Sequence, residues 1–305
     1  MRWTVVGQIL LAGFAGAAYA SDGVIEINQI KALAGGVDAC DTPGFPISIC
    51  KSGSYRLTSN LDAGRGESAI ELNTANVAID LGGMIISGSS ACLIGPSGWV
   101  ISCTTHRADG ISGPNAAGVS VRNGAIAGFD NCVALGDGAR VSDLAVAGCN
   151  GSGLSLSGES SVDHVAARSN LVDGIYCAGR VRLSDVVAAH NGVMGVQADG
   201  GGMLQSVSAD NNGYAGIWLP ASGTLSDFSS HRNGANGAQV AAGALVSSGS
   251  LSDNGVADAS AYALGTYPGA GFRALVISSV NGGNTAKVDG GGVNLGGNTC
   301  NGGAC

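Results

Sequence analysis

A column of charged and hydroxyl side chains recurs at intervals of 21 residues in the middle of the chain. Its members are Asp143, His164, Asp185, Ser206 and Asp227. If successive 21-residue segments lie over one another, His164 falls between two carboxylates, which favours the imidazolium ion and raises the pKa of the His. Arg140 and Arg182 recur in the same way three residues earlier, with Ser161 between them.

These residues suggest acid–base chemistry on an acidic sugar. Two guanidinium groups can bind a carboxylate, and a His beside them can move a proton at the neighbouring carbon. On this hypothesis the protein is a polyuronate lyase or a uronate epimerase, with His164 as its acid or base. Asp143 and Asp185 would orient the imidazole, and Arg140 and Arg182 would hold the carboxylate.

A structural interpretation of the same column competes with the catalytic one. Asp and Ser are common in turns because their side chains bond nearby backbone groups, and His164 could simply replace one of them. His–Asp sets with shifted pKa values are often structural. An acidic protein also repels a polyuronate. We therefore favour polysaccharide binding over catalysis, and keep two alternatives: the enzyme, and a non-catalytic structural or surface solenoid.

A second column at the same interval carries aromatic and amide side chains. Its members are Ser155, Tyr176, Gln197, Trp218 and Gln239. Tyr176 and Trp218 are two intervals apart, about 10 Å if one interval is one strand spacing. Aromatic faces and amides on a flat sheet are suited to binding a polysaccharide. Alternatively, both aromatics are covered by loops, since single surface aromatics need no function.

The interval of 21 is carried by glycine, asparagine and apolar residues along the chain. The recurring residues include Gly153, Gly174, Gly195, Gly216 and Gly237, and Asn170, Asn191, Asn212, Asn233 and Asn254. Apolar pairs such as Ile175 and Cys177 alternate with an outward residue, which indicates short strands. We expect each Gly to form a corner with positive φ and each Asn amide to bond the Asn of the next coil.

These features predict one all-β domain, a parallel β-helix of about ten coils with 21 residues in each. Several glycines per repeat exclude a coiled coil, and the Leu pattern of leucine-rich repeats is missing. With 53 Gly among 305 residues and 12% charged residues, most helical folds are disfavoured. A net charge of −8 makes nucleic acids and anionic membranes poor partners.

Several segments match a known family pattern. They are DGVIEINQIKALAGGV at residues 22–37, SGSYRLTSNL, VAIDLGGMIISG at residues 77–88, the repeats that end in Asn, and GGNTCNGGAC. Together they resemble a family of exported bacterial right-handed parallel β-helix proteins, related in fold to pectate lyases. The resemblance covers nearly the whole chain after residue 20. It implies the fold and no particular activity, because many members have no established one, and neither polygalacturonase nor calcium-binding motifs are present.

The expected organisation begins with a signal peptide over residues 1–20. Arg2, an apolar stretch and the Ala18, Tyr19, Ala20 ending predict cleavage after Ala20 and a secreted or periplasmic protein. Residues 21–53 are expected to cap the first coil with a short amphipathic helix over 25–34, whose apolar face would hold Ile27, Ile30 and Ala34. Coils then cover 54–290, interrupted by loops at 89–117 and 255–271, and a tail covers 291–305.

Nine cysteines follow the predicted signal peptide, and export permits disulfides. Three pairs are close in sequence and predict bridges: Cys40 with Cys50, Cys92 with Cys103, and Cys300 with Cys305. Cys177 lies in an apolar column and is expected to be a buried thiol. Cys132 and Cys149 are offset by four residues in the repeat, which we expect to be too far for a bridge, and their pairing stays open. No metal site or cofactor is expected.

Overall fold

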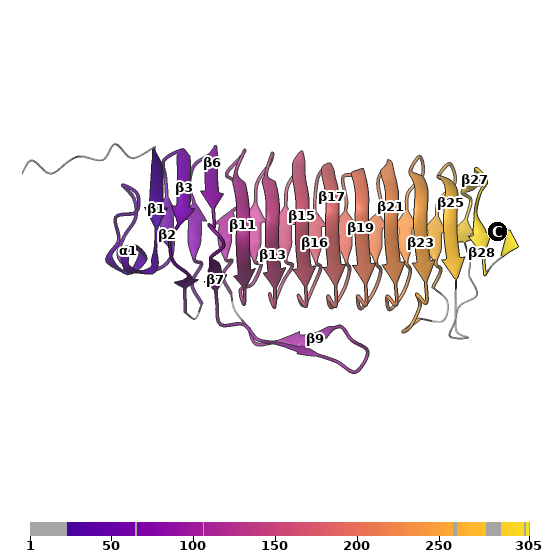
Figure 1. Ribbon diagram of the computed structural model, residues 1–305, viewed down its shortest axis with the longest axis horizontal. Helices are drawn as coiled ribbons and strands as arrows, with labels where there is room; N and C mark the ends of the chain where they lie inside the picture. The colour runs from indigo at the N-terminus through magenta and orange to yellow at the C-terminus, as the bar shows by residue number, and fades with distance from the viewer. Residues whose placement is uncertain are drawn as a thin grey trace, which may run out of the picture.

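The computed structural model describes residues 23–64, 66–105, 107–258, 261–278, 288–301 and 303–304. They form a right-handed parallel β-helix of about eleven coils, stacked along one axis (Figure 1). The predicted fold class is therefore confirmed. The predicted signal peptide and Cys305 lie outside the described residues. No helix among the described residues is long and apolar enough to cross a membrane.

Two sheets run along the stack within the described part of the chain. The first, sheet A, contains β1 (Val24–Ile27), β3 (Gly53–Leu57), β4 (Leu61–Asp62), β6 (Val77–Asp80), β7 (Ile85–Ser87), β11 (Ser120–Ala127), β13 (Arg140–Ala147), β15 (Ser160–Arg168), β17 (Val181–Ala189), β19 (Gly202–Asp210), β21 (Gly223–His231), β23 (Leu245–Ser252), β25 (Gly271–Ser278), β27 (Val293–Asn294), β28 (Thr299–Cys300) and β29 (Gly303–Ala304). Its central strands are long and bend in the middle.

The second sheet, sheet B, is built from short strands. It contains β2 (Ile47–Ile49), β5 (Ile70–Leu72), β10 (Ile111–Gly113), β12 (Val133–Leu135), β14 (Leu154–Leu156), β16 (Ile175–Cys177), β18 (Val196–Ala198), β20 (Ile217–Leu219), β22 (Ala238–Val240), β24 (Leu264–Thr266) and β26 (Val288–Gly290). Ile175 pairs with Val196 and Val196 pairs with Ile217, so equal positions in the repeat are direct neighbours. Their buried side chains form the core between the sheets.

The predicted asparagine ladder is confirmed and lies inside the solenoid. The Nδ2 atom of Asn191 donates to Oδ1 of Asn212 at 3.0 Å, and Asn212 donates in turn to Asn233 at 2.9 Å. All three residues are fully buried. The positive φ belongs to the residue before each Asn, such as His190 and Asn211 at 62° and 53°. Asn and His adopt this conformation more readily than most residues.

The glycine column has a different role from the predicted one. Gly153, Gly174 and Gly195 do not have positive φ. A Cβ on Gly174 would lie 2.7 Å from Nδ2 of Asn191 and 2.7 Å from the backbone oxygen of Gly195. Glycine is therefore required because the asparagine ladder of the next coil packs directly against it.

Three disulfides join described cysteines: Cys40–Cys50, Cys92–Cys103 and Cys132–Cys149. The first two confirm predictions, while the third corrects the expectation that its cysteines lie too far apart. The chain turns between the two columns and brings their Cα atoms to 5.8 Å. Cys177 is a buried free thiol whose pKa is raised by burial to about 12. Cys300 is disulfide-bonded, and its predicted partner lies outside the described residues.

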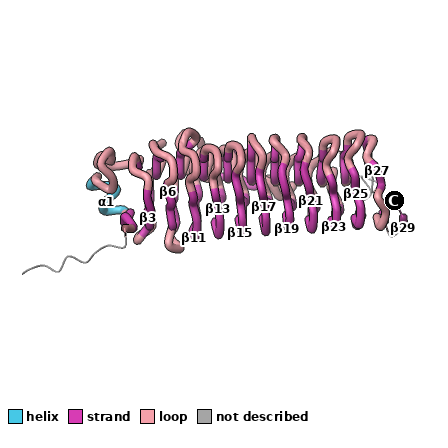
Figure 2. Tube along the Cα trace, turned by 90° about the horizontal axis from the view of Figure 1, so that it is seen from above, coloured by secondary structure: helices cyan, strands magenta, loops and turns pink. Residues whose placement is uncertain are grey.

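The N-terminal end of the stack carries helix α1 (Gln29–Ala34), drawn in cyan in Figure 2. It begins later than predicted, because residues 24–27 form β1 and pair with β3. Its first turn is capped by Asn28, whose side chain accepts a bond from the backbone N of Lys31 at 2.9 Å. Ala32 is buried and Ile30 is 81% exposed, so the predicted apolar face is wrong. The capping role of this segment stays a prediction.

The range 89–117 contains a hairpin formed by β8 (Cys92–Ile94) and β9 (Val100–Cys103). The hairpin runs alongside the coils (Figure 1) and is held there by the backbone N of Val100, which donates to the oxygen of His190 at 3.1 Å. Strand β10 lies inside this predicted insertion but belongs to sheet B. Strand β24 likewise lies inside the predicted insertion 255–271. Both insertions are therefore shorter than expected.

Candidate functional site

The aromatic and amide column lies on the outer face of sheet B. Tyr176 pairs with Gln197, Gln197 with Trp218, and Trp218 with Gln239 along adjacent strands. Because the residues on either side of each are buried, these four side chains point outward, and all four are half-buried. The structure thus brings the four predicted ligand-binding residues together in one row, which we call the platform.

A carboxylate that sequence reasoning missed links two members of the platform. The hydroxyl of Tyr176 donates to Oδ2 of Asp199 at 3.2 Å, and Nε2 of Gln197 donates to Oδ1 of the same residue at 2.8 Å. Asp199 stands two residues after Gln197, so the strand period of two already places both on one face. This network fixes the orientation of the Tyr176 ring and the Gln197 amide.

A second carboxylate, Asp173, lies before β16 and is only 5% exposed. Its Oδ1 accepts a bond from the backbone N of Met194 at 3.0 Å. Burial raises the pKa of Asp173 to about 6, and the charge on Asp199 adds to this shift. The pKa of Tyr176 is raised by burial and by both carboxylates, which places the phenol in the electrostatic field of Asp199 and Asp173.

The other end of the platform is flanked by Asn236, which precedes β22, and by Tyr267, which follows β24. Nδ2 of Asn236 donates to Oε1 of Gln239 at 2.8 Å, and Nε2 of Gln239 lies 3.5 Å from the hydroxyl of Tyr267. Tyr267 is 48% exposed and comes from the second predicted insertion. Tyr267 thus adds a third aromatic ring beside the platform, because the next position of the row itself is Gly265.

The column of His164 forms the bend in the strands of sheet A. Asp143, His164 and Asp185 have φ of 50°, 50° and 52°, and Ser206 and Asp227 have φ of 53° and 52°. Non-Gly residues seldom adopt this conformation, and Asn, Asp and His do so most readily. The backbone geometry alone thus accounts for much of the composition of this column, as the structural interpretation holds.

His164 takes its main partner from its own coil. Its Nδ1 lies 2.7 Å from Oδ2 of Asp163, whereas Nε2 lies 3.9 Å from Oδ2 of Asp185. The hydrogen bond to Asp163 is the largest cause of the raised pKa of His164, and Asp185 and Asp143 contribute less. Asp163 also accepts a hydrogen bond from Ser184, which lowers its own pKa most. The stacked carboxylates are therefore secondary partners.

The three side chains Asp163, His164 and Asp185 also offer ligand atoms within 4.8 Å of one another. Such a set has the composition of a divalent cation site. All three lie at the surface, and exposed acidic groups commonly cluster without an ion. The expectation that the protein needs no metal is not tested by this geometry.

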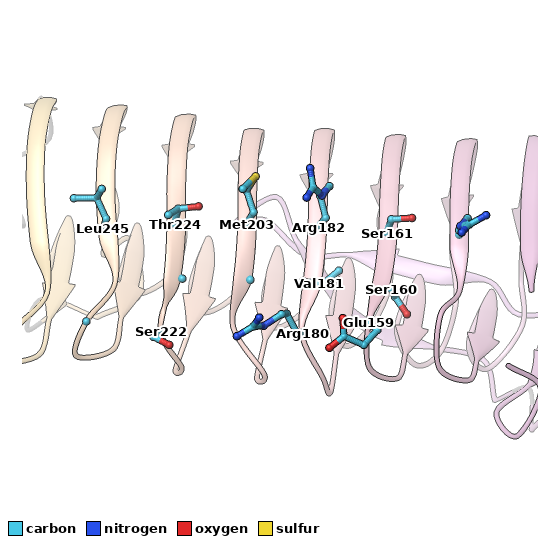
Figure 3. A pocket seen from close by; sticks show the side chains of 14 residues that line it. Glu159, Ser160, Ser161, Arg180, Val181, Arg182, Met203, Ser222, Thr224 and Leu245 are labelled. Carbon is cyan, nitrogen blue, oxygen red and sulfur yellow. The ribbon is translucent and has the colours of Figure 1, made fainter. Parts of the chain in front are cut away.

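Arg140 and Arg182 lie in a groove that does not include His164. Arg140 pairs with Ser161, and Ser161 pairs with Arg182, so the two arginines are two coils apart on sheet A. They line a groove of about 730 Å³ together with Arg180, as Figure 3 shows for Arg180 and Arg182. His164, Asp143 and Asp185 are not among its lining residues. The five predicted catalytic residues thus do not converge in one cavity.

No family model matches this chain, and no curated protein matches it. Among solved structures, it is similar to the A-module of the Azotobacter vinelandii mannuronan C-5 epimerase AlgE6. That match has a TM-score of 0.53 and 14% identity over 90% of this chain and 85% of the other. The chain has the fold of the right-handed parallel β-helix proteins. The resemblance predicted from sequence is confirmed as a likeness of fold.

Two further β-helix matches are more distant. The A-module of the Azotobacter vinelandii mannuronan C-5 epimerase AlgE4 gives a TM-score of 0.47 at 13% identity, over 81% of this chain and 89% of that one. The Agl-KA catalytic domain gives 0.48 at 10% identity, over 82% and 61% of the two chains.

Proposed function

We propose that this β-helix protein binds a polysaccharide along the platform on sheet B. The observation that carries the proposal is the register of Tyr176, Gln197 and Trp218, which places two outward aromatic rings two coils apart with an amide between them. That separation is about 10 Å from the strand spacing. An extended sugar chain lying across the coils can place the C–H faces of two of its sugars on the two rings.

The polar groups of the platform suit a ligand rich in hydroxyl groups. Asp199, Gln197 and Gln239 present carboxylate and amide oxygens, which accept hydrogen bonds from sugar hydroxyls. Asp199 and Asp173 also make this face negative above the pKa of Asp173, near 6. A neutral polysaccharide is therefore a better ligand for the platform than a polyuronate.

The fold is compatible with such a ligand. The β-helix module matched with a TM-score above 0.5 is named a mannuronan epimerase, although at 14% identity the likeness extends only to the fold. Three disulfides between described cysteines fit an oxidising compartment outside the cytoplasm, in line with the predicted signal peptide. We infer that the protein meets its polysaccharide after export.

A binding screen tests this function. The chain from residue 21 onward is passed over insoluble neutral and acidic polysaccharides, and bound and free protein are measured. We expect retention on at least one neutral polysaccharide. Retention on none would contradict the proposal and leave a structural solenoid, the third interpretation of the sequence.

The lyase or epimerase alternative makes a separate prediction. If His164 is its acid or base, His164→Ala abolishes turnover of a uronate polymer and leaves the fold intact. The exposed His164 and its separation from the arginine groove both count against this alternative. Absence of turnover by the unmodified protein across the same panel would remove it.

A further inference from the structure

The groove beside the three arginines lies at the edge of sheet A, where each chain turn leaves sheet B. It crosses the N-terminal ends of β13, β15, β17, β19, β21 and β23 (Figure 3). The place that Arg140 and Arg182 hold in their coils is held in the next three coils by Met203, Thr224 and Leu245. The groove therefore has a cationic half followed by an apolar half.

The cationic half is not neutralised from within the protein. Arg140, Arg180 and Arg182 are all exposed, and Glu159 is the one acidic residue that lines the groove with them. The ion pairs formed among described residues involve none of these three arginines. In a chain with a net charge of −8, three arginines facing one groove make a local positive site.

Glycine leaves the floor of the groove open. Gly202 and Gly223 hold the position of Val181 in the next two coils. Gly202 has a φ of 139°, and a Cβ on it would lie 1.9 Å from the backbone oxygen of Val181. No larger residue fits there without moving the coil, so the close approach of the two coils beneath the groove requires glycine.

We propose that this groove binds an acidic polysaccharide through its carboxylate or sulfate groups, at a site separate from the platform. Guanidinium groups bind both anions in a paired geometry. Arg140 and Arg182 are two coils apart, about 10 Å from the strand spacing, so they engage two acidic groups of one chain rather than a single small anion. Met203 and Leu245 then offer apolar surface to the C–H faces of the sugars that follow.

Nucleic acid fits this groove less well. Binding to single strands relies on aromatic side chains that stack on bases, and no aromatic side chain lines the groove. Binding to duplexes relies on many phosphate contacts, which three arginines on a negative protein do not supply. An acidic polysaccharide matches both the charged and the apolar half.

The test uses a double variant that carries both Arg140→Gln and Arg182→Gln. Its control is the single variant Arg168→Gln. Arg168 is an exposed arginine at the opposite end of β15 and does not line the groove, so the control removes charge from the same sheet. Binding to polygalacturonate, dextran sulfate, neutral dextran and a short DNA duplex is measured by affinity electrophoresis at low and high salt. Polygalacturonate and dextran sulfate distinguish carboxylate from sulfate as the bound group.

We expect binding to at least one of the two acidic polysaccharides that weakens with salt, and none to dextran. The double variant should bind at least about tenfold more weakly, and Arg168→Gln should bind as the unmodified protein does. Equal binding by the double variant, equal binding to DNA, or no binding to either acidic probe would overturn the proposal.

A platform variant keeps the two sites distinguishable. Tyr176→Ala with Trp218→Ala should retain binding to the acidic probe even if it loses the neutral polysaccharide. Loss of both ligands in that variant would show that one surface serves for both and would contradict a separate groove. Conversely, if the protein binds the acidic probe and no neutral polysaccharide, the result would contradict binding at the platform and support the groove.

Discussion

Cys132 and Cys149 form a disulfide at the place that Gly153 and Asn170 occupy one coil later. A Cβ on Gly153 would lie 2.8 Å from Nδ2 of Asn170, so these two columns touch between adjacent coils. The disulfide thus substitutes a covalent link for a contact between glycine and the asparagine ladder. The backbone N of Cys149 still donates to Oδ1 of Asn170 at 3.1 Å, which continues the ladder.

This relationship predicts that Cys132→Gly with Cys149→Asn preserves the fold better than Cys132→Ser with Cys149→Ser. Both changes remove a cross-link that closes a 17-residue separation, at a cost of about 3 kcal/mol. Only the first restores the glycine and amide that the next coil uses, so it should recover part of that loss. Denaturant unfolding of both variants measures the difference. If the two variants are equally stable, or the Gly and Asn variant is less stable, the disulfide does not take the place of the contact between glycine and asparagine.

Asn191→Ala should destabilise the protein strongly. The amide of Asn191 is fully buried, donates to Asn212 and to the oxygen of Ala167, and accepts from the backbone N of Asn170. Its loss leaves buried partners unsatisfied, at about 1 to 3 kcal/mol for each such group. Asn115→Ala, at an exposed position, is the control and should be nearly neutral. Similar unfolding midpoints for both variants would show that the ladder adds no stability.

His164 should titrate above its ordinary pKa of 6.5, because Asp163 holds its proton. A raised His pKa stabilises the folded state at pH values below 6.5, and this stabilisation is lost as the pH rises through the folded pKa. A proton NMR titration of the imidazole measures it directly. Asp163→Asn should lower the pKa of His164 more than Asp185→Asn does. The reverse order would mean that the stacked carboxylate is the main partner after all.

Asp173→Asn should stabilise the protein at pH 7 and have little effect at pH 4. Burial raises the pKa of Asp173 from its ordinary value of 3.8 to about 6 in the folded state. The folded state therefore loses stability as the pH rises from 3.8 to about 6, and above that pH the loss stays constant. Two pKa units correspond to about 2 to 3 kcal/mol. The amide oxygen can still accept the bond from Met194. Unfolding measured at both pH values checks this, and a gain that is larger at pH 4 would have the wrong sign.

The period of 21 was enough to predict the fold and the rows of neighbouring side chains. Ile175, Val196 and Ile217 stack as expected because strands of adjacent coils pair at equal positions in the repeat. The same reasoning placed Tyr176 beside Gln197 and Gln197 beside Trp218.

Contacts between residues of different columns could not be predicted from that period. Asp163 bonds His164, and Asp199 bonds Tyr176, through side-chain conformations that the repeat does not specify. The turn that brings Cys132 to Cys149 likewise depends on how the backbone folds between two columns. Arg180 enters the groove from the turn before Arg182, a position that the search along columns left out.

The most direct test of the platform uses the neutral polysaccharide found in the binding screen. Its affinity is measured by titration calorimetry for the unmodified chain, for Tyr176→Ala with Trp218→Ala, and for Tyr214→Ala, an aromatic that is 45% exposed and outside the platform. Each variant is first shown to unfold at the temperature of the unmodified chain within a few degrees. We expect the double variant to bind at least about tenfold more weakly, since two aromatic contacts are lost, while Tyr214→Ala binds normally. Unchanged affinity in the double variant would contradict polysaccharide binding at the platform.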